Sequence, residues 1–587
     1  MTRRSRPAQG QRPRAWFIGD ITDFRRRGLW LVLAFSAMAV AVLGRLVQVQ
    51  VMQSHALAAA ARAQHTSDVT LHGNRGLIVD RSGRVLASNR SVYDVFVDPA
   101  LVDPPQREEV ATKLSGVLAA SESTVLAALS QPNEFDYVAK GVSAQINERL
   151  HALDLPGVGT VPTQQRVYDP SPLQQSSFAA NLLGFVDADG NGQYGLEQNY
   201  NKVLSGEAGH ESTLTDLLGN SIVLSGEQRV DAHDGSNLQL GLDSQLQYWA
   251  ELALAKGVAD TGSASGTLMV MDPHTGSVRA WAQYPTYDGN NYGSSKLSNF
   301  LDMAVSAPYE PGSVMKTVTF AGGLNNHTIT PDTVIDERQT MIDGYLIHDW
   351  DGRSHGSVTM QRVLDLSLNN GAIKLQQMEG QDPFYTNMLA FGIGAPTGID
   401  LAGEVNDPMP PQQSWNTLSY AEASFGQGIL TTPVEMLSAV NAVANGGVWV
   451  QPHVVDAVVD PSTGKATHVT PHTRRVISPE AAATLSHMMV GVVDDKGSEG
   501  NTAQIPGYKG EVAGKTGTAS VAEHGRYGDN VIVSFAGFMP ADNPQFTMMI
   551  VLNKPQESSQ PRFGATLAAP VWKDVAQLIV DEWRIQP

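Results

Sequence analysis

The pattern of hydrophobic and polar positions begins with one long apolar stretch near the N-terminus. Residues 28–44 read GLWLVLAFSAMAVAVLG and contain no charged residue. As a helix rising about 1.5 Å per residue, this stretch measures about 25 Å. The mostly apolar residues 46–52 continue it beyond Arg45, whose long side chain can reach the membrane surface. The total is enough to cross about 30 Å of hydrocarbon, so the pattern predicts a single transmembrane helix over residues 28–52.

Shorter apolar runs follow this stretch. Residues 53–242 mix short β-type segments with Gly, Asp and Ser turns, which predicts an irregular, extended α+β domain. Arg81-Ser82-Gly83 has turn chemistry, so the segments on either side of it are expected to form a hairpin. The predicted elements are strands over residues 77–80, 84–87 and 92–97, followed by two short helices within residues 105–129.

From residue 243 onward the apolar segments become longer and more regular. Two of them are joined by Asp-Pro-His-Thr-Gly and predict a β-hairpin, and helical stretches dominate residues 313–443. Strands at both ends with helices between them predict one antiparallel sheet with helices on both sides, and hence an α+β fold class. The expected elements are a helix over 244–258, strands over 267–272, 277–283, 510–519, 531–538 and 546–552, and a closing helix over 571–583.

The distribution of charge gives the chain an orientation. Residues 1–27 contain eight Arg and two Asp, a net charge of +6, whereas the rest of the chain carries −25. By the positive-inside rule, the N-terminal tail lies in the cytoplasm and the acidic body lies outside. A cleaved signal peptide would need a shorter apolar stretch and a nearby small-residue cleavage site, but Gly44 is followed by Arg45 and a further apolar run. The expected domains are a cytoplasmic basic tail (1–27), an uncleaved membrane anchor (28–52), a pedestal domain (53–242) and a larger C-terminal domain (243–587).

The composition excludes several classes of function. With 42% hydrophobic and 17% charged residues, the chain can bury a core and is not disordered as a whole. It contains no Cys, which excludes disulfide scaffolds, thiolate metal sites and Cys nucleophiles. The acidic body argues against nucleic acid as a partner, because a phosphate backbone requires a basic surface.

The first candidate for chemistry is Ser313-Val314-Met315-Lys316, which follows Pro311-Gly312 at the predicted start of a helix. Residues i and i+3 share a helical face, so Lys316 can reach the Ser313 hydroxyl. A Ser hydroxyl is a weak nucleophile until a base removes its proton, and a Lys can be that base when burial or a second cation lowers its pKa. A second S-x-x-K, at residues 462–465, lies in a turn that does not hold the two side chains on one face, so we interpret it as structural.

An S-x-N sequence follows at residues 367–369. Ser367 supplies a hydroxyl that can relay a proton, and Asn369 supplies an amide for hydrogen bonds to a peptide. Ser414-Trp415-Asn416 has the same pattern. Taken alone, either sequence is more simply interpreted as a helix cap or a loop.

The third candidate is Lys515-Thr516-Gly517-Thr518, on a predicted strand. Lys515 offers a fixed cation, the two Thr hydroxyls can bind a carboxylate, and Gly517 leaves room for a substrate backbone. A nucleotide-binding P-loop is excluded, because the Gly that it requires five residues before Gly514 is Lys509.

In this order, S-x-x-K, S-x-N and K-T-G are the motif set of penicillin-binding proteins and class A β-lactamases, although the middle residue of S-x-N is Leu here rather than Asp. The chain resembles the class B penicillin-binding proteins, which are peptidoglycan D,D-transpeptidases. The resemblance extends to RGLIVDRSG at residues 75–83, GLEQNY at 195–200 and YEPGS at 309–313. SFGQG at 424–428 and PTGIDL at 396–401 are more similar to the division-type branch than to the elongation-type branch.

The resemblance implies a catalytic role for five residues. Ser313 would attack the penultimate D-Ala of a stem peptide, Lys316 would take its proton, and Ser367 would pass a proton to the departing D-Ala. Asn369 would hold Lys316 and the substrate amide, while Lys515 would supply positive potential near the substrate carboxylate. Which Lys acts as the general base stays open.

The resemblance also implies how substrates and inhibitors bind. Thr516, Gly517 and Thr518 would form the wall that binds the substrate carboxylate. The backbone N–H groups of Ser313 and Thr518 would form the oxyanion hole. β-Lactam antibiotics would acylate Ser313 and stay attached, and no cofactor or metal would be needed.

The implied partners are a SEDS-type glycosyltransferase and other division proteins of the membrane, reached through the helix and the pedestal. The implied location is the bacterial plasma membrane, with the transpeptidase domain (243–587) outside the cytoplasm.

Three other functions stay open. An elongation-type transpeptidase would carry the same motifs. A β-lactamase or peptidase would share the Ser–Lys chemistry but would need neither an anchor nor a pedestal. A scaffold that activates a glycan polymerase would not need intact motifs.

A group of residues that could suggest a metal site lies between the first two motifs. It lies among Gly and Ser, so we interpret it as solvated residues of a surface loop. Its members are His348, Asp349, Asp351 and His355.

Overall fold

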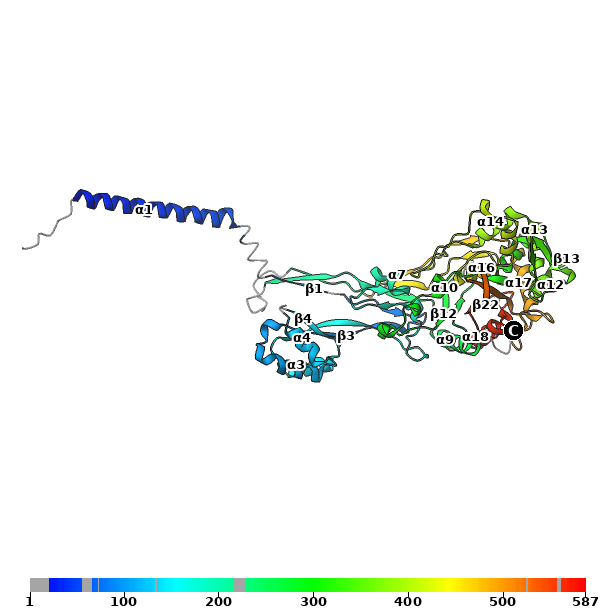
Figure 1. Cartoon of the computed structure of the whole chain (residues 1–587), viewed down its shortest axis with the longest axis horizontal. Coiled ribbons are helices and arrows are strands. Elements are labelled where there is room, and N and C mark those ends of the chain that lie inside the picture. Colours follow the sequence, from blue (N-terminus) through cyan, green and yellow to red (C-terminus); the bar gives the residue numbers. More distant parts are fainter. Residues whose placement is uncertain are drawn as a thin grey trace, which may run out of the picture. The chain divides into compact units, whose positions relative to one another are not determined.

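The computed structural model describes residues 21–54, 57, 66–71, 73–131, 135–214, 228–523, 526–556 and 561–586 (Figure 1). It divides into two compact units, one formed by Met1–His72 with Ala208–Ala232 and the other by Gly73–Glu207 with His233–Pro587. Residues 1–20, which make up most of the predicted cytoplasmic tail, lie outside the described residues.

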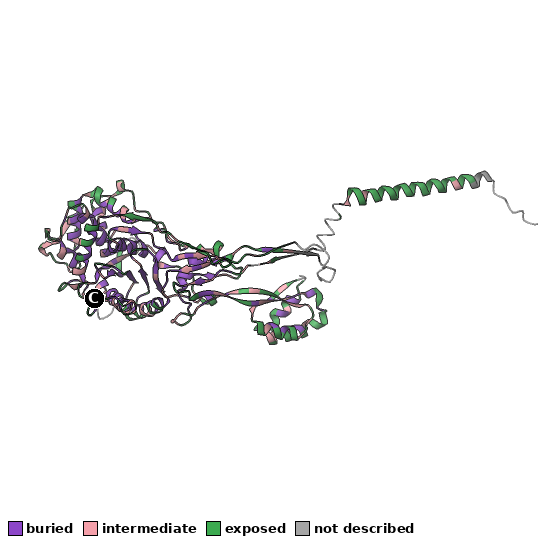
Figure 2. Ribbon diagram, turned by 180° about the vertical axis from the view of Figure 1, so that it is seen from behind, coloured by how far each residue is buried: buried purple, intermediate pink, exposed green. Residues whose placement is uncertain are grey.

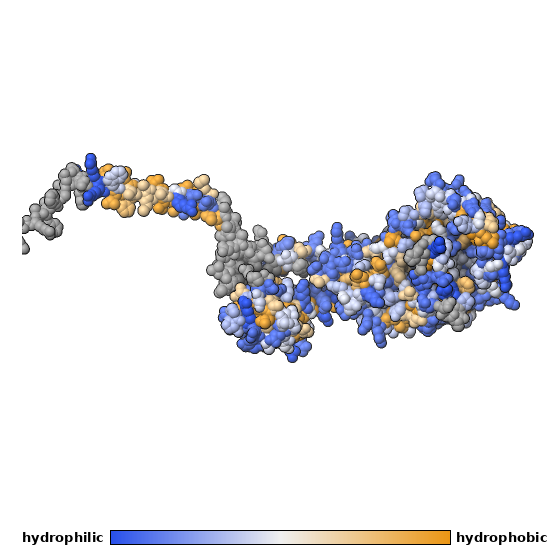
Figure 3. All heavy atoms as spheres, viewed as in Figure 1, coloured by the Kyte–Doolittle hydropathy of each residue, from blue (hydrophilic) through white to orange (hydrophobic). Residues whose placement is uncertain are grey.

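The first unit contains the predicted membrane helix. α1 spans Ile21–Val47 and continues as a π-helical turn, η1, over Gln48–Met52. The helix begins before residue 28 because residues 21–27 contain no Pro or Gly to stop it. The stretch Arg25–Met52 is long and apolar enough to cross a membrane, as its mostly orange surface in Figure 3 shows. No residue in its most apolar part is buried. This unit also contains an antiparallel sheet of β1 (Thr66–Leu71), β8 (Gly209–Leu214) and β9 (Gln228–Val230).

The second unit begins with a pedestal built on a seven-stranded sheet. Its strand order is β19-β18-β10-β2-β3-β4, with β5 also paired to β3. The predicted hairpin is confirmed, and the Asp80 carboxylate closes its turn by accepting hydrogen bonds from the Ser82 and Arg84 N–H groups. The strands have the bounds β2 Ile78–Val79, β3 Val85–Val97, β4 Asp136–Val142, β5 Val158–Tyr168, β10 Asn237–Leu240, β18 Val455–Val459 and β19 Ala466–His468.

Two details of the pedestal differ from the prediction. The strands predicted over residues 84–87 and 92–97 form one strand, β3, because the polar residues between them pair with β5 in unbroken register. β18 and β19 come from the C-terminal part of the chain, so the pedestal sheet is not built from residues 53–242 alone. The two predicted helices are confirmed as α3 Arg107–Val117 and α4 Glu122–Leu129, and α5 follows at Ala144–Ala152.

A buried ion cluster joins separate segments of the pedestal. Glu197, on α7 (Gly195–Asn199), has no exposed surface. Its carboxylate accepts hydrogen bonds from Nε of Arg75 and Nε of Arg166, both at 2.7 Å, and from the Tyr168 hydroxyl at 3.2 Å. These bonds bring RGLIVDRSG and GLEQNY together, because a buried carboxylate is stable only with charged and hydrogen-bonding partners.

The C-terminal domain is centred on a five-stranded antiparallel sheet. Its strand order is β12-β11-β23-β22-β21, so the strands predicted at the two ends of the domain are confirmed and share one sheet. The strands and the main covering helices are β11 Ser265–Met271, β12 Val278–Tyr284, β21 Ala513–Glu523, β22 Arg526–Met539, β23 Phe546–Asn553, α9 Ser244–Thr261, α16 Pro433–Ala444, α17 Pro479–Asp494 and α18 Gly564–Trp583.

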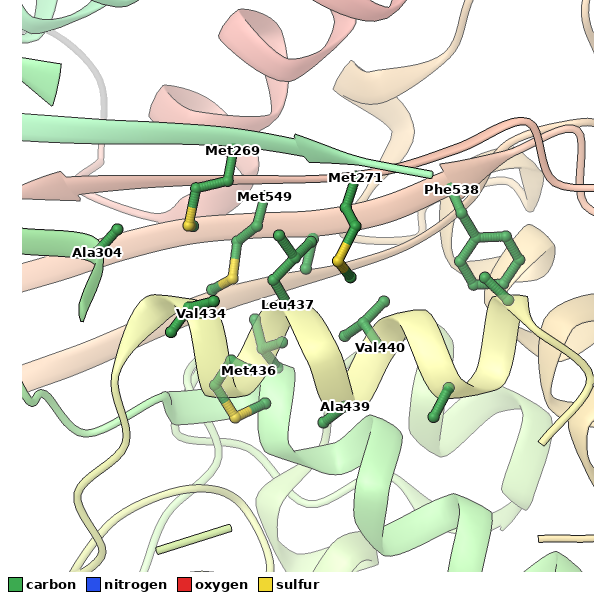
Figure 4. Packing of buried hydrophobic residues seen from close by; sticks show 14 of the residues in the cluster. Met269, Met271, Ala304, Val434, Met436, Leu437, Ala439, Val440, Phe538 and Met549 are labelled. Atoms are coloured by element: carbon green, nitrogen blue, oxygen red, sulfur yellow. The ribbon is translucent and has the colours of Figure 1, made fainter. Parts of the chain in front are cut away.

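Successive residues of these strands enter two different cores. Leu268 and Val270 of β11 pack with α9 and α18. Met269 and Met271 lie in the other core, where Figure 4 shows them facing Leu437 and its neighbours on α16. Figure 2 shows how the buried residues, in purple, concentrate in this sheet and its helices. Both faces are covered, so the sheet carries apolar runs such as Leu268–Met271 of β11 and Met548–Leu552 of β23, and the predicted α+β fold with helices on both sides is confirmed.

Between β12 and β21 the chain forms the insertion that carries most of the remaining helices. These elements are α10 Met303–Ser306, α11 Lys316–Asn325, β13 Val334–Glu337, β14 Thr340–Ile342, β15 Tyr345–Ile347, β16 Gly356–Thr359, α12 Met360–Asp365, α13 Asn369–Glu379, α14 Gln381–Phe391, α15 Thr417–Ala423, β17 Val448–Val450 and β20 Thr473–Arg475.

Removing the carboxylate of Glu197 would leave Arg75 and Arg166 buried without a counter-charge. We expect Glu197→Ala to lower the free energy of unfolding by about 3–5 kcal/mol. Urea unfolding of the full-length chain in detergent, followed by tryptophan fluorescence, measures this change. Glu109→Ala is the control, because it removes an exposed ion pair with Lys113 and should leave the unfolding midpoint unchanged. Equal midpoints for the two variants would contradict the importance of the cluster.

Candidate active site

Ser313 lies in a 3-10 turn, η6 (Gly312–Met315), directly before α11. Residues i and i+3 eclipse in a 3-10 turn, and Nζ of Lys316 lies 2.9 Å from Oγ of Ser313. Gly312 has a φ of +55°, and its N–H donates to the Gly426 carbonyl at 3.0 Å. A Cβ on Gly312 would also collide with the backbone of Thr518, so only glycine fits at this turn.

Lys316 has no exposed surface, and its Nζ makes polar contacts inside the domain. It lies 2.7 Å from the Ser367 carbonyl oxygen and 2.8 Å from Oδ1 of Asn369. A neutral amine has two N–H donors and one lone pair. It can therefore donate to these two oxygens and accept the proton of the Ser313 hydroxyl, which is the geometry of a general base.

Ser367 connects the two lysines. It lies between α12 and α13 with a φ of +55°, a left-handed conformation that costs a non-glycine residue about 1–3 kcal/mol. Its Oγ lies 2.8 Å from Nζ of Lys515 and 3.3 Å from Nζ of Lys316. The hydroxyl is thus in position to pass a proton between the lysines and a bound group.

The Lys-Thr-Gly-Thr sequence lies on a strand, as predicted, and this strand, β21, forms one edge of the sheet. A Cβ on Gly517 would collide with the side chain of Ser534, which explains the glycine. Oγ1 of Thr518 accepts a hydrogen bond from the first N–H of α18, at Gly564, at 3.0 Å. The Thr516 hydroxyl donates to a carboxylate oxygen of Glu499 at 2.9 Å.

The two buried lysines affect each other's protonation. Burial and the nearby positive charge of Lys515 hold the pKa of Lys316 well below its usual range, against the opposing effect of Glu499 and Asp349. Burial lowers the pKa of Lys515 to about 8, against the opposing effect of Glu499 and Asp365. The site therefore favours a neutral Lys316 beside a charged Lys515, the combination that a base next to an anion site requires.

Asp349 corrects the prediction of a solvated loop. Its side chain is only 3% exposed, and Oδ1 accepts hydrogen bonds from the N–H groups of Asn369 at 2.5 Å and Asn370 at 3.2 Å. The N-cap residue of α13, Leu368, has no capping side chain, and Asp349 caps the helix from a distant loop instead. Asp351 and His355 are also partly buried, and the described residues contain no group of three potential metal ligands.

A small cavity of about 130 Å³ lies over the three motifs. Its polar lining includes Glu499, which sequence analysis did not identify, and its apolar lining comes from two loops and the start of α18. The lining residues are Ser313, Trp350, Ser367, Asn369, Phe425, Gln427, Glu499, Thr516, Thr518, Phe563 and Ala565.

The structure brings the predicted site residues together and separates the decoys from them. Ser462 lies in an exposed turn, where its hydroxyl donates to Asp460. Asn416 caps α15 through its side chain. Sequence analysis assigned Asp349 to a solvated loop and did not identify Glu499, because these residues lie 20 and 17 residues from the motif residues that they contact and no local spacing links them.

Comparison with known proteins gives two family matches. Residues 266–577 match the family described as penicillin binding protein transpeptidase domain, and residues 70–240 match penicillin-binding protein dimerisation domain. These matches cover the C-terminal domain and the pedestal.

Individual relatives match over nearly the whole chain. Stage V sporulation protein D of Bacillus subtilis is 30% identical, over 96% of this chain and 86% of its own length. Peptidoglycan D,D-transpeptidase FtsI of Escherichia coli is 28% identical, over 95% of this chain and 91% of its own. The crystal structure of penicillin binding protein 3 from Mycobacterium tuberculosis complexed with aztreonam has a TM-score of 0.67 at 27% identity, over 88% of this chain and 98% of that one. With its pedestal, its transpeptidase domain and these relatives, the chain belongs to the class B penicillin-binding proteins.

Proposed function

We propose that this chain forms peptide cross-links between peptidoglycan stem peptides during septal wall synthesis, through an acyl-enzyme on Ser313. The chain is a serine-type D,D-transpeptidase of the penicillin-binding family, so it binds stem peptides and β-lactams. The observation that supports the assigned residues is the unbroken hydrogen-bond chain from Ser313 through Lys316 and Ser367 to Lys515.

In the first half of the reaction, Lys316 accepts the Ser313 proton as Oγ attacks the carbonyl of the penultimate D-Ala. The developing oxyanion is bound by the backbone N–H groups of Ser313 and Thr518. The first lies in the opening turn of η6, where N–H groups lack helical partners, and the second lies on the edge strand β21. Asn369 keeps the Lys316 amine in place and holds the substrate amide.

The leaving group and the second substrate then use the same proton path in opposite directions. As the C–N bond breaks, Ser367 passes the proton from Lys316 to the terminal D-Ala, which departs as an amine. An amine from a neighbouring stem peptide attacks the acyl-enzyme and gives up a proton along this path, and Ser313 is released. Lys515, with the Thr516–Thr518 wall, holds the carboxylate of the donor peptide.

We place the enzyme in division rather than elongation. Support comes from SFGQG at residues 424–428 and PTGIDL at 396–401, and from the similarity to FtsI of Escherichia coli. An elongation role and a scaffold role are the alternatives. The intact hydrogen bonding of all three motifs favours a catalytic role over a purely structural one.

We further infer a single-pass topology for the chain. The basic residues before residue 28 favour a cytoplasmic tail (1–27), an anchor (28–52), and a pedestal (53–242) and transpeptidase domain (243–587) outside the cytoplasm. The partner that we propose is a SEDS-type glycosyltransferase, together with other division proteins of the membrane. Support comes from the uncovered apolar surface of α1, which would contact such a partner within the bilayer.

The nucleophile is tested by intact mass and peptide mapping of the full-length chain after incubation with benzylpenicillin. We expect a persistent adduct of one drug molecule on Ser313, and none in Ser313→Ala. Ser462→Ala is the matched control, since it removes the serine of the other S-x-x-K, and it should be acylated like the wild type. An adduct that survives in Ser313→Ala would overturn the assignment.

The pH dependence of acylation tests the roles of the two lysines. Burial lowers the pKa of Lys515 to about 8, so this side chain loses its charge as the pH rises through 8, whereas the pKa of Lys316 is held well below its usual range by burial and by Lys515. We expect the acylation rate to fall above pH 8. Lys515→Arg should move this fall upward by about two pH units or more, because a guanidinium keeps its proton. Intact-mass measurements of reactions stopped at successive times, from pH 6 to 10, give the acylation rate at each pH. If the rates of the wild type and Lys515→Arg fall at the same alkaline pH, the role of Lys515 is contradicted.

Asp349 is expected to act as a positioning residue for Asn369. Asp349→Ala removes the acceptor for two backbone N–H groups at the start of α13, so acylation by benzylpenicillin should slow by about ten- to a hundredfold. Asp349→Asn keeps one acceptor oxygen and should recover part of the rate. Asp351→Ala in the same loop is the control and should stay within about twofold of the wild type. A wild-type rate in Asp349→Ala would show that Asn369 needs no such support.

A further inference from the structure

Glu499 places a carboxylate inside the active-site cavity. It lies in the loop after α17, and its backbone N–H donates to the Asp365 carbonyl at 3.0 Å, which fixes the residue beside α12. Its side chain is about one-fifth exposed, and it lines the cavity together with Ser313 and Thr518. None of the catalytic steps proposed above uses it.

The Glu499 carboxylate contacts the anion-binding part of the site. One oxygen accepts the hydrogen bond of the Thr516 hydroxyl at 2.9 Å, and the same oxygen lies 3.9 Å from Nζ of Lys515. Nζ of Lys515 in turn lies 3.1 Å from Oγ1 of Thr516. The Thr516 hydroxyl therefore accepts a hydrogen bond from Lys515 and donates its only hydrogen bond to Glu499.

This arrangement conflicts with the binding of an anion. In the proposed function, Thr516 and Thr518 hold the carboxylate of the donor peptide. The ligand carboxylate would need to accept the Thr516 hydroxyl hydrogen bond, which Glu499 already accepts. It would also approach the negative charge of Glu499. Like charges a few ångströms apart repel strongly where solvent is largely excluded. The ligand must either displace Glu499 from Thr516 or bind without that hydrogen bond.

We propose that Glu499 is a specificity-determining residue that competes with the ligand carboxylate for the Thr516 hydroxyl and thereby weakens the preference of the site for anionic acylating ligands. The inference rests on the proposed function of the Ser313 site. With Glu499 present, the wall formed by Lys515, Thr516 and Thr518 prefers a carboxylate less strongly than these three residues would on their own.

The test compares two ligands that differ only in the relevant charge. Benzylpenicillin carries the carboxylate, and benzylpenicillin methyl ester carries a neutral ester in its place. The second-order acylation rate constant of Ser313 is measured for both, by intact mass, in the full-length wild type and in Glu499→Gln. The ratio of the two rate constants is the readout, because a loss of folded protein affects both ligands equally.

At pH 6, well below the Lys515 pKa of about 8 that Glu499 helps to maintain, we expect Glu499→Gln to raise the ratio of the benzylpenicillin rate constant to the ester rate constant by about tenfold, mainly through faster acylation by benzylpenicillin. Glu499→Asp keeps the charge but withdraws it from the Thr516 hydroxyl by one methylene group, so its ratio should lie between those of the wild type and Glu499→Gln. Glu480→Gln removes an exposed carboxylate in the first turn of α17 and should not change either rate constant.

Two outcomes would overturn the inference and are distinguishable from each other. If Glu499→Gln changes both rate constants by the same factor, or changes neither, Glu499 only anchors its loop, and the proposed function stands. If the wild type forms no adduct on Ser313 with either ligand, the proposed function fails, and this inference fails with it.

Discussion

A lysine amine without exposed surface persists in a protein only if its polar contacts are supplied from within, and Lys316 obtains them from two neighbouring segments. The 3-10 turn supplies the Ser313 hydroxyl, and the loop before α13 supplies the Ser367 carbonyl and Asn369. Two features of the site follow from this need to supply Lys316 with polar partners. Ser367 adopts a left-handed conformation that turns both its carbonyl and its hydroxyl toward the lysines, and Asp349 holds the start of α13 so that Asn369 stays in reach.

The fold supplies the rigidity that this arrangement requires. α11 runs through the core with a buried face, so the base sits on a helix that cannot shift without disturbing the packing around α16. β21 is bonded to β22 along its length, and Gly564 at the start of α18 presses against Gly517 and Ser534. The wall that would bind the carboxylate is therefore fixed by the sheet, and the last helix of the chain fixes it from behind.

Most of the fold was predictable from the sequence because its signals are local. The apolar runs of β11, β22 and β23 predict strands buried on both faces, and Arg81-Ser82-Gly83 predicts the turn after β2. The three motifs were predictable because the short spacing within each motif already places its reactive side chains near one another. Long-range contacts were not predictable: β18 joins the pedestal sheet from more than two hundred residues away, since Val455 and its neighbours pair with β10. For the same reason the buried Asp349 was taken for a solvated residue, and Glu499 was not noticed.

The close contact between Gly312 and Gly426 has a consequence for how this enzyme can change over evolutionary time. Two backbones meet there without side chains: a Cβ on Gly426 would strike the backbone of Gly312, and a Cβ on Gly312 would strike the backbone of Thr518. The floor beneath the nucleophile is thus made of main chain, which substitution can hardly vary. The rim of the cavity, at Trp350, Gln427 and Phe563, is made of side chains instead. Substitutions that adapt the enzyme to new ligands, including those that reduce antibiotic binding, are therefore expected at the rim. A change of side chain there alters the shape of the cavity and leaves the reacting atoms in place.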